Sequence, residues 1–178
     1  DIPEKYWHEH NGIRLMVMGQ LKRGGSGCYC AENVLLQALV HHLLLARNEV
    51  VILDMEAGIE HLTRATAKAV DRLIIVVEPG RRSVETANRI RELAGDIGIT
   101  RIAIAGNKIK SEAEKEFLIS SLPGFEFAGF IPYDQAVVDA DLAGRPVLEA
   151  SKPVVQAARD IFQALLSKAR TVGAAENR

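Results

Sequence analysis

Cys28 and Cys30 are the only cysteines in this 178-residue sequence, and one residue separates them. Side chains two residues apart in an extended segment point to the same side of the chain. The small residues before them, Gly24 to Gly27, let the backbone come close to a target. Zinc and thiolate-rich nickel sites use about four ligands. One chain therefore offers half of a metal site, and the alternative is two ordinary small apolar thiols.

A carboxylate follows the apolar run 49–53, in the segment Asp54-Met55-Glu56-Ala57-Gly58. A strand that ends in a carboxylate, with a glycine shortly after it, suits a magnesium-side acid and a backbone N–H that meets a terminal phosphate. Acids at strand ends also cap the following helix. The sequence leaves both interpretations of Asp54 and Gly58 open.

Two further segments follow predicted strands and carry polar or aromatic groups. They are Asn107-Lys108 and Pro132-Tyr133-Asp134. Amide and backbone groups at such positions suit a pocket that reads a nucleotide base, and plain turn chemistry is the alternative. His8 and His10 could bind a metal ion, and the alternative, which the sequence favours, is a mobile, tag-like terminus.

Composition indicates a soluble protein with a substantial core. The hydrophobic share is 48%, the charged share is 25% and the formal net charge is −1. This balance gives no attraction to nucleic acid or to an anionic membrane, and no apolar run approaches the roughly 18 residues of a spanning helix. Paired cysteines one residue apart favour a reducing compartment, so we expect a cytoplasmic protein. Because the sequence begins at Asp1, we expect it to start within a larger protein.

Hydrophobic periodicity predicts an α/β fold with a mostly parallel sheet and helices on both faces. Apolar runs alternate with amphipathic segments along the chain, and residues 1–178 are expected to form a single domain. The loops that follow the strands should all lie at one edge of the sheet, where ligands bind in such folds. The predicted strands are 13–21, 49–54, 72–77, 99–106 and 125–131, and the predicted helices are 31–46, 62–70, 83–95, 111–121, 134–140 and one that begins near Pro153.

The glycine-rich segment Gly24 to Gly27 is not a phosphate loop. A phosphate loop needs a lysine followed by serine or threonine after its last glycine. Cys28 and Tyr29 occupy those positions here.

Taken together, these motifs resemble those of the carbon monoxide dehydrogenase nickel-insertion accessory ATPases, a branch of the MinD/ParA-type deviant P-loop NTPases. Gly27 to Cys30 is similar to that family's metal-binding C-x-C motif, and Asp54 to Leu62 is similar to its switch II. The segment from Val77 to Ser83 continues the same pattern. The resemblance runs from about Ile13 to Ala169.

The resemblance implies an ATP-dependent homodimer. Asp54 would hold the magnesium-bound water and Gly58 would sense the terminal phosphate. Cys28 and Cys30 of both subunits would bind nickel or zinc, with carbon monoxide dehydrogenase as the client. The positions that would surround adenine are Asn107, Lys108, Pro132, Tyr133 and Asp134.

The deviant Walker A loop of that family is absent from these residues. The chain therefore resembles the carboxyl-terminal two thirds of such a domain, without its first strand and P-loop. We expect ATP hydrolysis with Mg²⁺ in the full-length protein and little or none in this chain alone.

Two rival functions fit the same sequence. Four cysteines at a dimer axis could hold an iron-sulfur cluster, as in electron-transfer ATPases of the nitrogenase-reductase type. A ParA-type partition or scaffolding switch would make both cysteines incidental.

Overall fold

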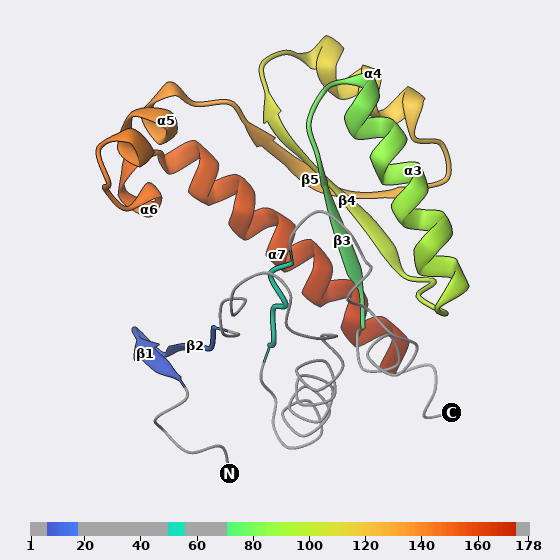
Figure 1. Cartoon of the computed structure of the whole chain (residues 1–178), viewed down its shortest axis with the longest axis horizontal. Helices are drawn as coiled ribbons and strands as arrows, with labels where there is room; N and C mark the ends of the chain where they lie inside the picture. The colour runs from blue at the N-terminus through green and yellow to red at the C-terminus, as the bar shows by residue number, and fades with distance from the viewer. Residues whose placement is uncertain (1–6, 18–49, 56–70, 174–178) are drawn as a thin grey trace, which may run out of the picture. The chain divides into compact units, whose positions relative to one another are not determined.

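The computed structural model describes residues 7–17, 50–55 and 71–173, with side chains up to residue 167 (Figure 1). The chain divides into two compact units, residues 1–51 and residues 52–178. The elements in the described residues are β1 (His8–His10), β2 (Ile13–Leu15), β3 (Leu73–Val77), α3 (Arg81–Asp96), β4 (Ile102–Ile109), α4 (Glu112–Ser121), β5 (Glu126–Pro132), α5 (Gln135–Leu142), α6 (Val147–Ala150) and α7 (Lys152–Gly173). None of the helices among them has the length and apolar character needed to cross a membrane.

In the first unit, β1 and β2 form an antiparallel hairpin. Asn11 and Gly12 make its two-residue turn with φ angles of 50° and 78°, as the Asn-Gly pair predicts. Of the strand predicted over 13–21, the described residues contribute only β2, and it does not lie in a core. Ile13 and Leu15 are 72% and 59% exposed, because a two-stranded hairpin has no second layer to cover it.

The second unit is built on a parallel sheet with the strand order β3-β4-β5. Leu73 pairs with Ile102 and Val77 with Gly106, so β3 and β4 run in register. Each connection passes through a helix, first α3 and then α4, because parallel strands need a crossover of a dozen or more residues. The predicted α/β class with a parallel sheet is confirmed.

Helices cover opposite faces of this sheet (Figure 1). α3 and α4 lie on one face, where Leu118 of α4 is fully buried. α7 packs against β5 on the other face, and there Ile161 lies against Gly129. Since α7 covers β5, the residues of β3 that alternate with its buried ones stay open, and Ile74 and Val76 are 43% and 60% exposed.

The main core lies between the sheet and the pair α3 and α4. Small residues let α3 approach closely, because Ala87 and Ala94 are completely buried on its apolar face. In the sequence, the spacing of Val84, Ala87, Ile90 and Ala94 is that of one helix face. The buried core residues are Ile75, Val77, Ala87, Ile104, Ile109, Leu118 and Leu122.

Several predicted boundaries are corrected by the structure. α3 begins at Arg81 with Gly80 as its N-cap, two residues before the predicted start of this helix at residue 83. The Ser83 hydroxyl instead accepts a hydrogen bond from the Glu78 N–H at 3.0 Å. β4 extends to Ile109, so Asn107 and Lys108 lie inside the strand rather than after it.

Residues 50–55, predicted as most of a central strand, carry no regular secondary structure. An apolar run becomes a strand only where a neighbour completes its hydrogen bonds. Ile52 is 79% exposed. The predicted helices 31–46 and 62–70, and the segment Gly24 to Gly27, lie outside the described residues.

Candidate functional site

The carboxyl ends of β3 and β4 are joined by an ion pair. The Lys108 ammonium lies 2.7 Å from the Glu78 carboxylate, and both side chains are about half exposed, at 57% and 50%. Glu78 follows β3 directly, and Lys108 belongs to the end of the neighbouring strand. The hydrogen bond that the Lys108 ammonium donates to this carboxylate, followed by the negative charge of Glu78, raises the pKa of Lys108.

The backbone at Lys108 adopts an unusual conformation. Its φ is +55°, a left-handed conformation that few residues other than glycine adopt. The pairing with β5 shifts between Gly106 and Ile109, so Asn107 and Lys108 form a bulge. Bulges redirect side chains and are common beside functional sites. Here the bulge places the Lys108 side chain toward β3 and Glu78.

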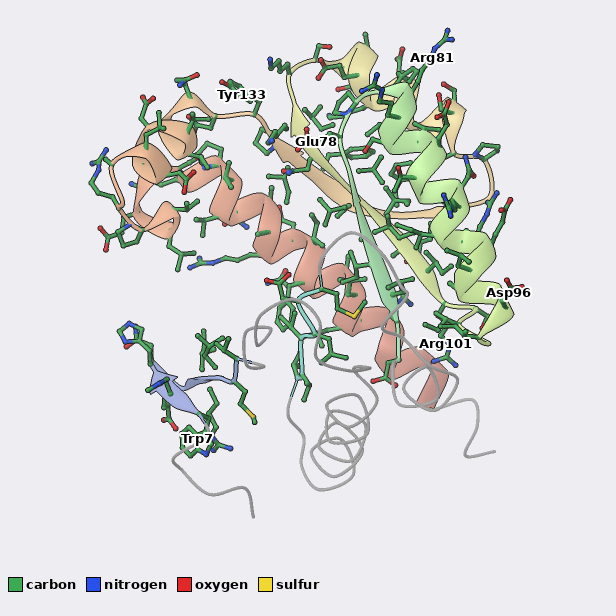
Figure 2. All side chains as sticks on the ribbon, viewed as in Figure 1. Trp7, Glu78, Arg81, Asp96, Arg101 and Tyr133 are labelled. Carbon is green, nitrogen blue, oxygen red and sulfur yellow. The ribbon has the colours of Figure 1, made fainter. Side chains whose placement is uncertain are left out.

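Tyr133 lies at the end of β5, beside the same edge. Its backbone N–H donates to the carbonyl of Ile109 at 2.9 Å, which ties the end of β5 to the end of β4. The Lys110 ammonium lies 4.5 Å from the centre of the Tyr133 ring. The Tyr133 hydroxyl donates to the side-chain oxygen of Gln135 at 2.6 Å. Figure 2 shows Glu78 and Tyr133 at one end of the sheet and Arg101 at the other.

A cleft of about 350 Å³ opens beside this edge. The start of α4 forms one wall, where the Ser111 hydroxyl caps the helix by accepting from the Glu114 N–H at 3.3 Å. The Glu114 carboxylate in turn accepts from the Lys110 N–H at 2.6 Å, an arrangement close to a capping box. The cleft is lined by Ile109, Lys110, Ser111, Glu112, Lys115, Phe130 and Pro132.

Asp134 is engaged in structural hydrogen bonds. One carboxylate oxygen accepts from the Ala136 N–H at 2.9 Å, which caps α5. The other accepts from the Ser151 hydroxyl at 2.5 Å, and Ser151 lies at the start of α7. These two bonds, the Ser151 bond first, lower the pKa of Asp134. Asp134 therefore joins α5 to α7 whatever else it contacts.

The structure brings the five predicted base-reading residues to the ends of two neighbouring strands. Asn107 and Lys108 end β4, while Pro132 ends β5 and Tyr133 and Asp134 follow it. Asn107 is half-buried and the Tyr133 ring is 36% exposed. An amide and an aromatic face, both reachable from solvent, fit the edge and the face of a nucleotide base.

Asp54 is not part of this group. Its neighbour Met55 packs against the small cluster of Ala94 and Ile99, together with Leu73. Leu73 is the first residue of β3, so Met55 lies by the amino end of that strand. The expectation that Asp54 ends a strand at the carboxyl edge is therefore not met, because 50–55 pairs with no strand of the described sheet.

The remaining predicted site residues, Cys28, Cys30 and Gly58, lie outside the described residues. Within the described part of the chain, no group of three or more histidine, cysteine, aspartate or glutamate side chains could hold a metal ion.

Two residues of this edge were not predicted as site residues. Glu78 was expected at this edge, in the loop after the strand 72–77, but no site role and no pairing with Lys108 were predicted for it. Ser151 gave a weaker signal, as a serine two residues before Pro153 at a helix start.

The chain is similar in sequence to the carbon monoxide dehydrogenase accessory protein CooC of Rhodospirillum rubrum. The two are 43% identical over 168 residues, which is 94% of this chain and 64% of CooC. The chain thus spans less than two thirds of the length of this relative. No protein-family model matches the sequence.

Two solved structures share the fold of this chain. The MinD cell division protein of Aquifex aeolicus is 28% identical, with a TM-score of 0.51 over 62% of this chain and 50% of MinD. A ParA family ATPase from Chlorobium tepidum is 22% identical, with a TM-score of 0.60 over 75% of this chain and 56% of the other. The expected resemblance to CooC-like proteins of the MinD/ParA type is therefore confirmed as a similarity in sequence to CooC and in fold to MinD and ParA proteins.

Proposed function

We propose that the protein to which this chain belongs is an ATP-dependent metallochaperone that assists nickel insertion into carbon monoxide dehydrogenase. The observation that carries the proposal is the 43% identity to the accessory protein CooC over 94% of the chain. Cys28 and Cys30 form a C-x-C pair in this CooC-like sequence. Nickel or zinc is the cargo of this protein rather than its resident cofactor.

The number of thiolates favours a site shared between two chains. Each chain supplies Cys28 and Cys30, whereas a thiolate-rich site for nickel or zinc uses about four ligands. A homodimer whose two-fold axis passes near both pairs would complete the set. ATP binding would draw the subunits together, and hydrolysis would loosen them and release the metal to the client enzyme.

Nucleotide recognition is assigned to the edge formed by β4 and β5. The Asn107 amide offers a donor and an acceptor to a base edge, and Tyr133 offers a ring face. Lys108 and Pro132 border the same position, and Asp134 holds the following helix in place. Asp54 and Gly58 keep their proposed roles at magnesium-bound water and terminal phosphate. In the nucleotide-bound full-length protein, these roles require Asp54 to lie at the carboxyl edge of the sheet. The segment 50–55 would then have to pair with a neighbouring strand.

This chain alone should hydrolyse little or no ATP. A phosphate loop has a glycine-rich segment followed by a lysine and then a serine or threonine. The printed sequence contains no such segment. We expect phosphate release from Mg-ATP at the background rate. Turnover above background that disappears in an Asp54→Asn variant would contradict the assignment.

Nickel binding by the cysteine pair tests the metal half of the proposal. Equilibrium dialysis of reduced protein against Ni²⁺, with optical spectra of the same samples, should reveal thiolate-to-nickel charge-transfer bands. These bands should be absent from Cys28→Ser and from Cys30→Ser, because each change leaves two thiolates per dimer. Identical bands in wild type and both variants would overturn thiolate ligation.

The rival functions predict different results. An electron-transfer ATPase with a four-cysteine iron-sulfur cluster would give a brown protein after anaerobic purification, lost in Cys28→Ser. A ParA-type scaffolding switch would keep its partner binding when both cysteines are replaced by serine. The close spacing of Cys28 and Cys30 favours the metallochaperone over the cluster.

A further inference from the structure

We propose that His8 and His10 form a chelating pair that binds a divalent transition-metal ion on the exposed hairpin β1–β2. The proposed ligands do not include Cys28 or Cys30, and the proposal does not depend on the function proposed above.

The register of the hairpin places both imidazoles on one face. His8 pairs with Leu15 and His10 pairs with Ile13, in an antiparallel ladder. Residues two apart in a strand share a face and lie about 6.6 Å apart along it. Two imidazoles at this spacing can turn toward one ion and reach it at the usual metal–nitrogen distance of about 2.0–2.1 Å.

The charged side chains of the hairpin lie on its other face. Arg14 contacts Glu9 at 3.6 Å, and its guanidinium lies 5.0 Å from the centre of the Trp7 ring. Glu9 and Trp7 alternate with the histidines along the strand. The positive charge of Arg14 is therefore kept away from the face that would receive a cation.

The histidine face is open and its geometry is fixed by a tight turn. Both histidines are exposed. The turn residues Asn11 and Gly12 have φ angles of 50° and 78°, which hold the two strands in their twisted register. The Asn11 amide nitrogen lies 3.1 Å from Nε2 of His10, and this exposed contact would be released when Nε2 binds a metal ion.

The chemistry of the pair selects the metal. Neutral imidazole is a good ligand for copper, nickel and zinc, and affinity at such nitrogen sites rises from Co²⁺ to Ni²⁺ to Cu²⁺. With two protein ligands, water completes the coordination shell. The site is therefore an exchangeable one, suited to collecting a metal ion rather than holding it permanently.

The test uses a protein in which both cysteines are replaced, so that only the histidine pair is measured. In a Cys28→Ser/Cys30→Ser protein, calorimetric titration with Ni²⁺ should show one site per chain, and Cu²⁺ should bind more tightly than Ni²⁺. His8→Ala and His10→Ala should each weaken Ni²⁺ binding about tenfold or more, because a chelate loses one arm. Glu9→Gln, on the opposite face, should leave the affinity unchanged.

A rearranged variant tests the geometry without changing the composition. Glu9→His combined with His10→Glu keeps two histidines but places them on opposite faces, so Ni²⁺ affinity should fall to the level of the single-histidine variants. Equal binding by this variant, or no Ni²⁺ binding above that of His8→Ala/His10→Ala, would overturn the proposal. Paramagnetic broadening of the His8 and His10 ring resonances by Ni²⁺ gives an independent readout.

Discussion

At the scale of single residues, Lys108 shows how the edge combines backbone strain with a charge contact. Its backbone is held at a φ of +55° while its side chain pairs with Glu78 across two strands. A non-glycine residue persists in this conformation only where surrounding contacts hold it, and such residues cluster at functional sites. The side chain and the backbone of Lys108 can be separated by substitution.

We predict that Lys108→Gly keeps the thermal stability of the chain close to wild type, because glycine adopts this φ without steric cost. Lys108→Val should lower the melting temperature clearly, since a β-branched side chain is strained there. Glu78→Gln, which removes only the exposed ion pair, should have a small and salt-dependent effect. A Lys108→Gly protein less stable than Lys108→Val would show that the side chain, not the backbone, determines this position.

Asp134 predicts a pH dependence of stability. Its pKa is lowered in the folded state by the Ser151 hydroxyl and the Ala136 N–H, so its carboxylate stabilises the fold at pH values above its unfolded pKa of about 3.9. This stabilisation is lost as the pH falls through the lower, folded value. Urea unfolding should therefore show Asp134→Ala less stable than wild type at pH 7, with the difference shrinking below about pH 4.

Ser151→Ala serves as the control for Asp134. It removes the first cause of the lowered pKa and leaves the cap of α5 intact. It should shift the acid transition of the wild type toward higher pH. A difference between Asp134→Ala and wild type that stays constant from pH 7 to pH 3 would contradict the role assigned to the carboxylate.

At the scale of elements, the contact between β5 and α7 depends on one glycine. A Cβ at Gly129 would lie 2.6 Å from Cγ1 of Ile161, closer than carbon atoms can approach. Ile161 is 8% exposed and packed, so this branch cannot swing away into solvent. The absence of a side chain at Gly129 therefore lets α7, which begins at Lys152, pack closely against β5.

We predict that Gly129→Ala destabilises the chain by about 1–3 kcal/mol, the usual cost of overpacking a core. Ile161→Ala in the same protein should recover part of this loss, so the two changes should be non-additive in a double-mutant cycle. Gly95→Ala is the matched control, because a Cβ there meets nothing within 4 Å and alanine favours a helix by about 0.5–1 kcal/mol. Additive effects of the first two changes would contradict the contact.

The elements that could be predicted are those whose signals are local. The spacing of apolar residues gave α3, and Ser111 and Asp134 marked the starts of α4 and α5. The prediction was wrong where secondary structure depends on pairing with a segment that is distant in sequence. Residues 50–55 have the composition of a strand, but composition carries no information on which strand lies beside it.

The candidate site divides in the same way. Residues 107–108 and 132–134 could be placed at one edge, since loops after parallel strands meet there. The bulge at Lys108 and its pairing with Glu78 could not be predicted, because a one-residue shift in register leaves no mark in hydrophobic periodicity.

At the scale of the whole molecule, we propose two sites, a nucleotide site at the edge of β4 and β5 and a metal site that uses two thiolates from each chain. Each chain brings Cys28 and Cys30, and closure of a dimer would supply the other two ligands. The similarity to the carbon monoxide dehydrogenase accessory protein CooC covers 94% of the chain. Metal binding and association of two chains should then be linked, because each stabilises the other.

The most direct test is the nickel content of the dimer, measured by native mass spectrometry on a His8→Ala/His10→Ala protein, so that the hairpin adds no ion. We predict that substoichiometric Ni²⁺ shifts monomers to dimers that carry one nickel ion. Cys28→Ser in the same background should abolish both the ion and the shift. One nickel ion on each monomer, unaffected by dimer formation, would contradict the shared site.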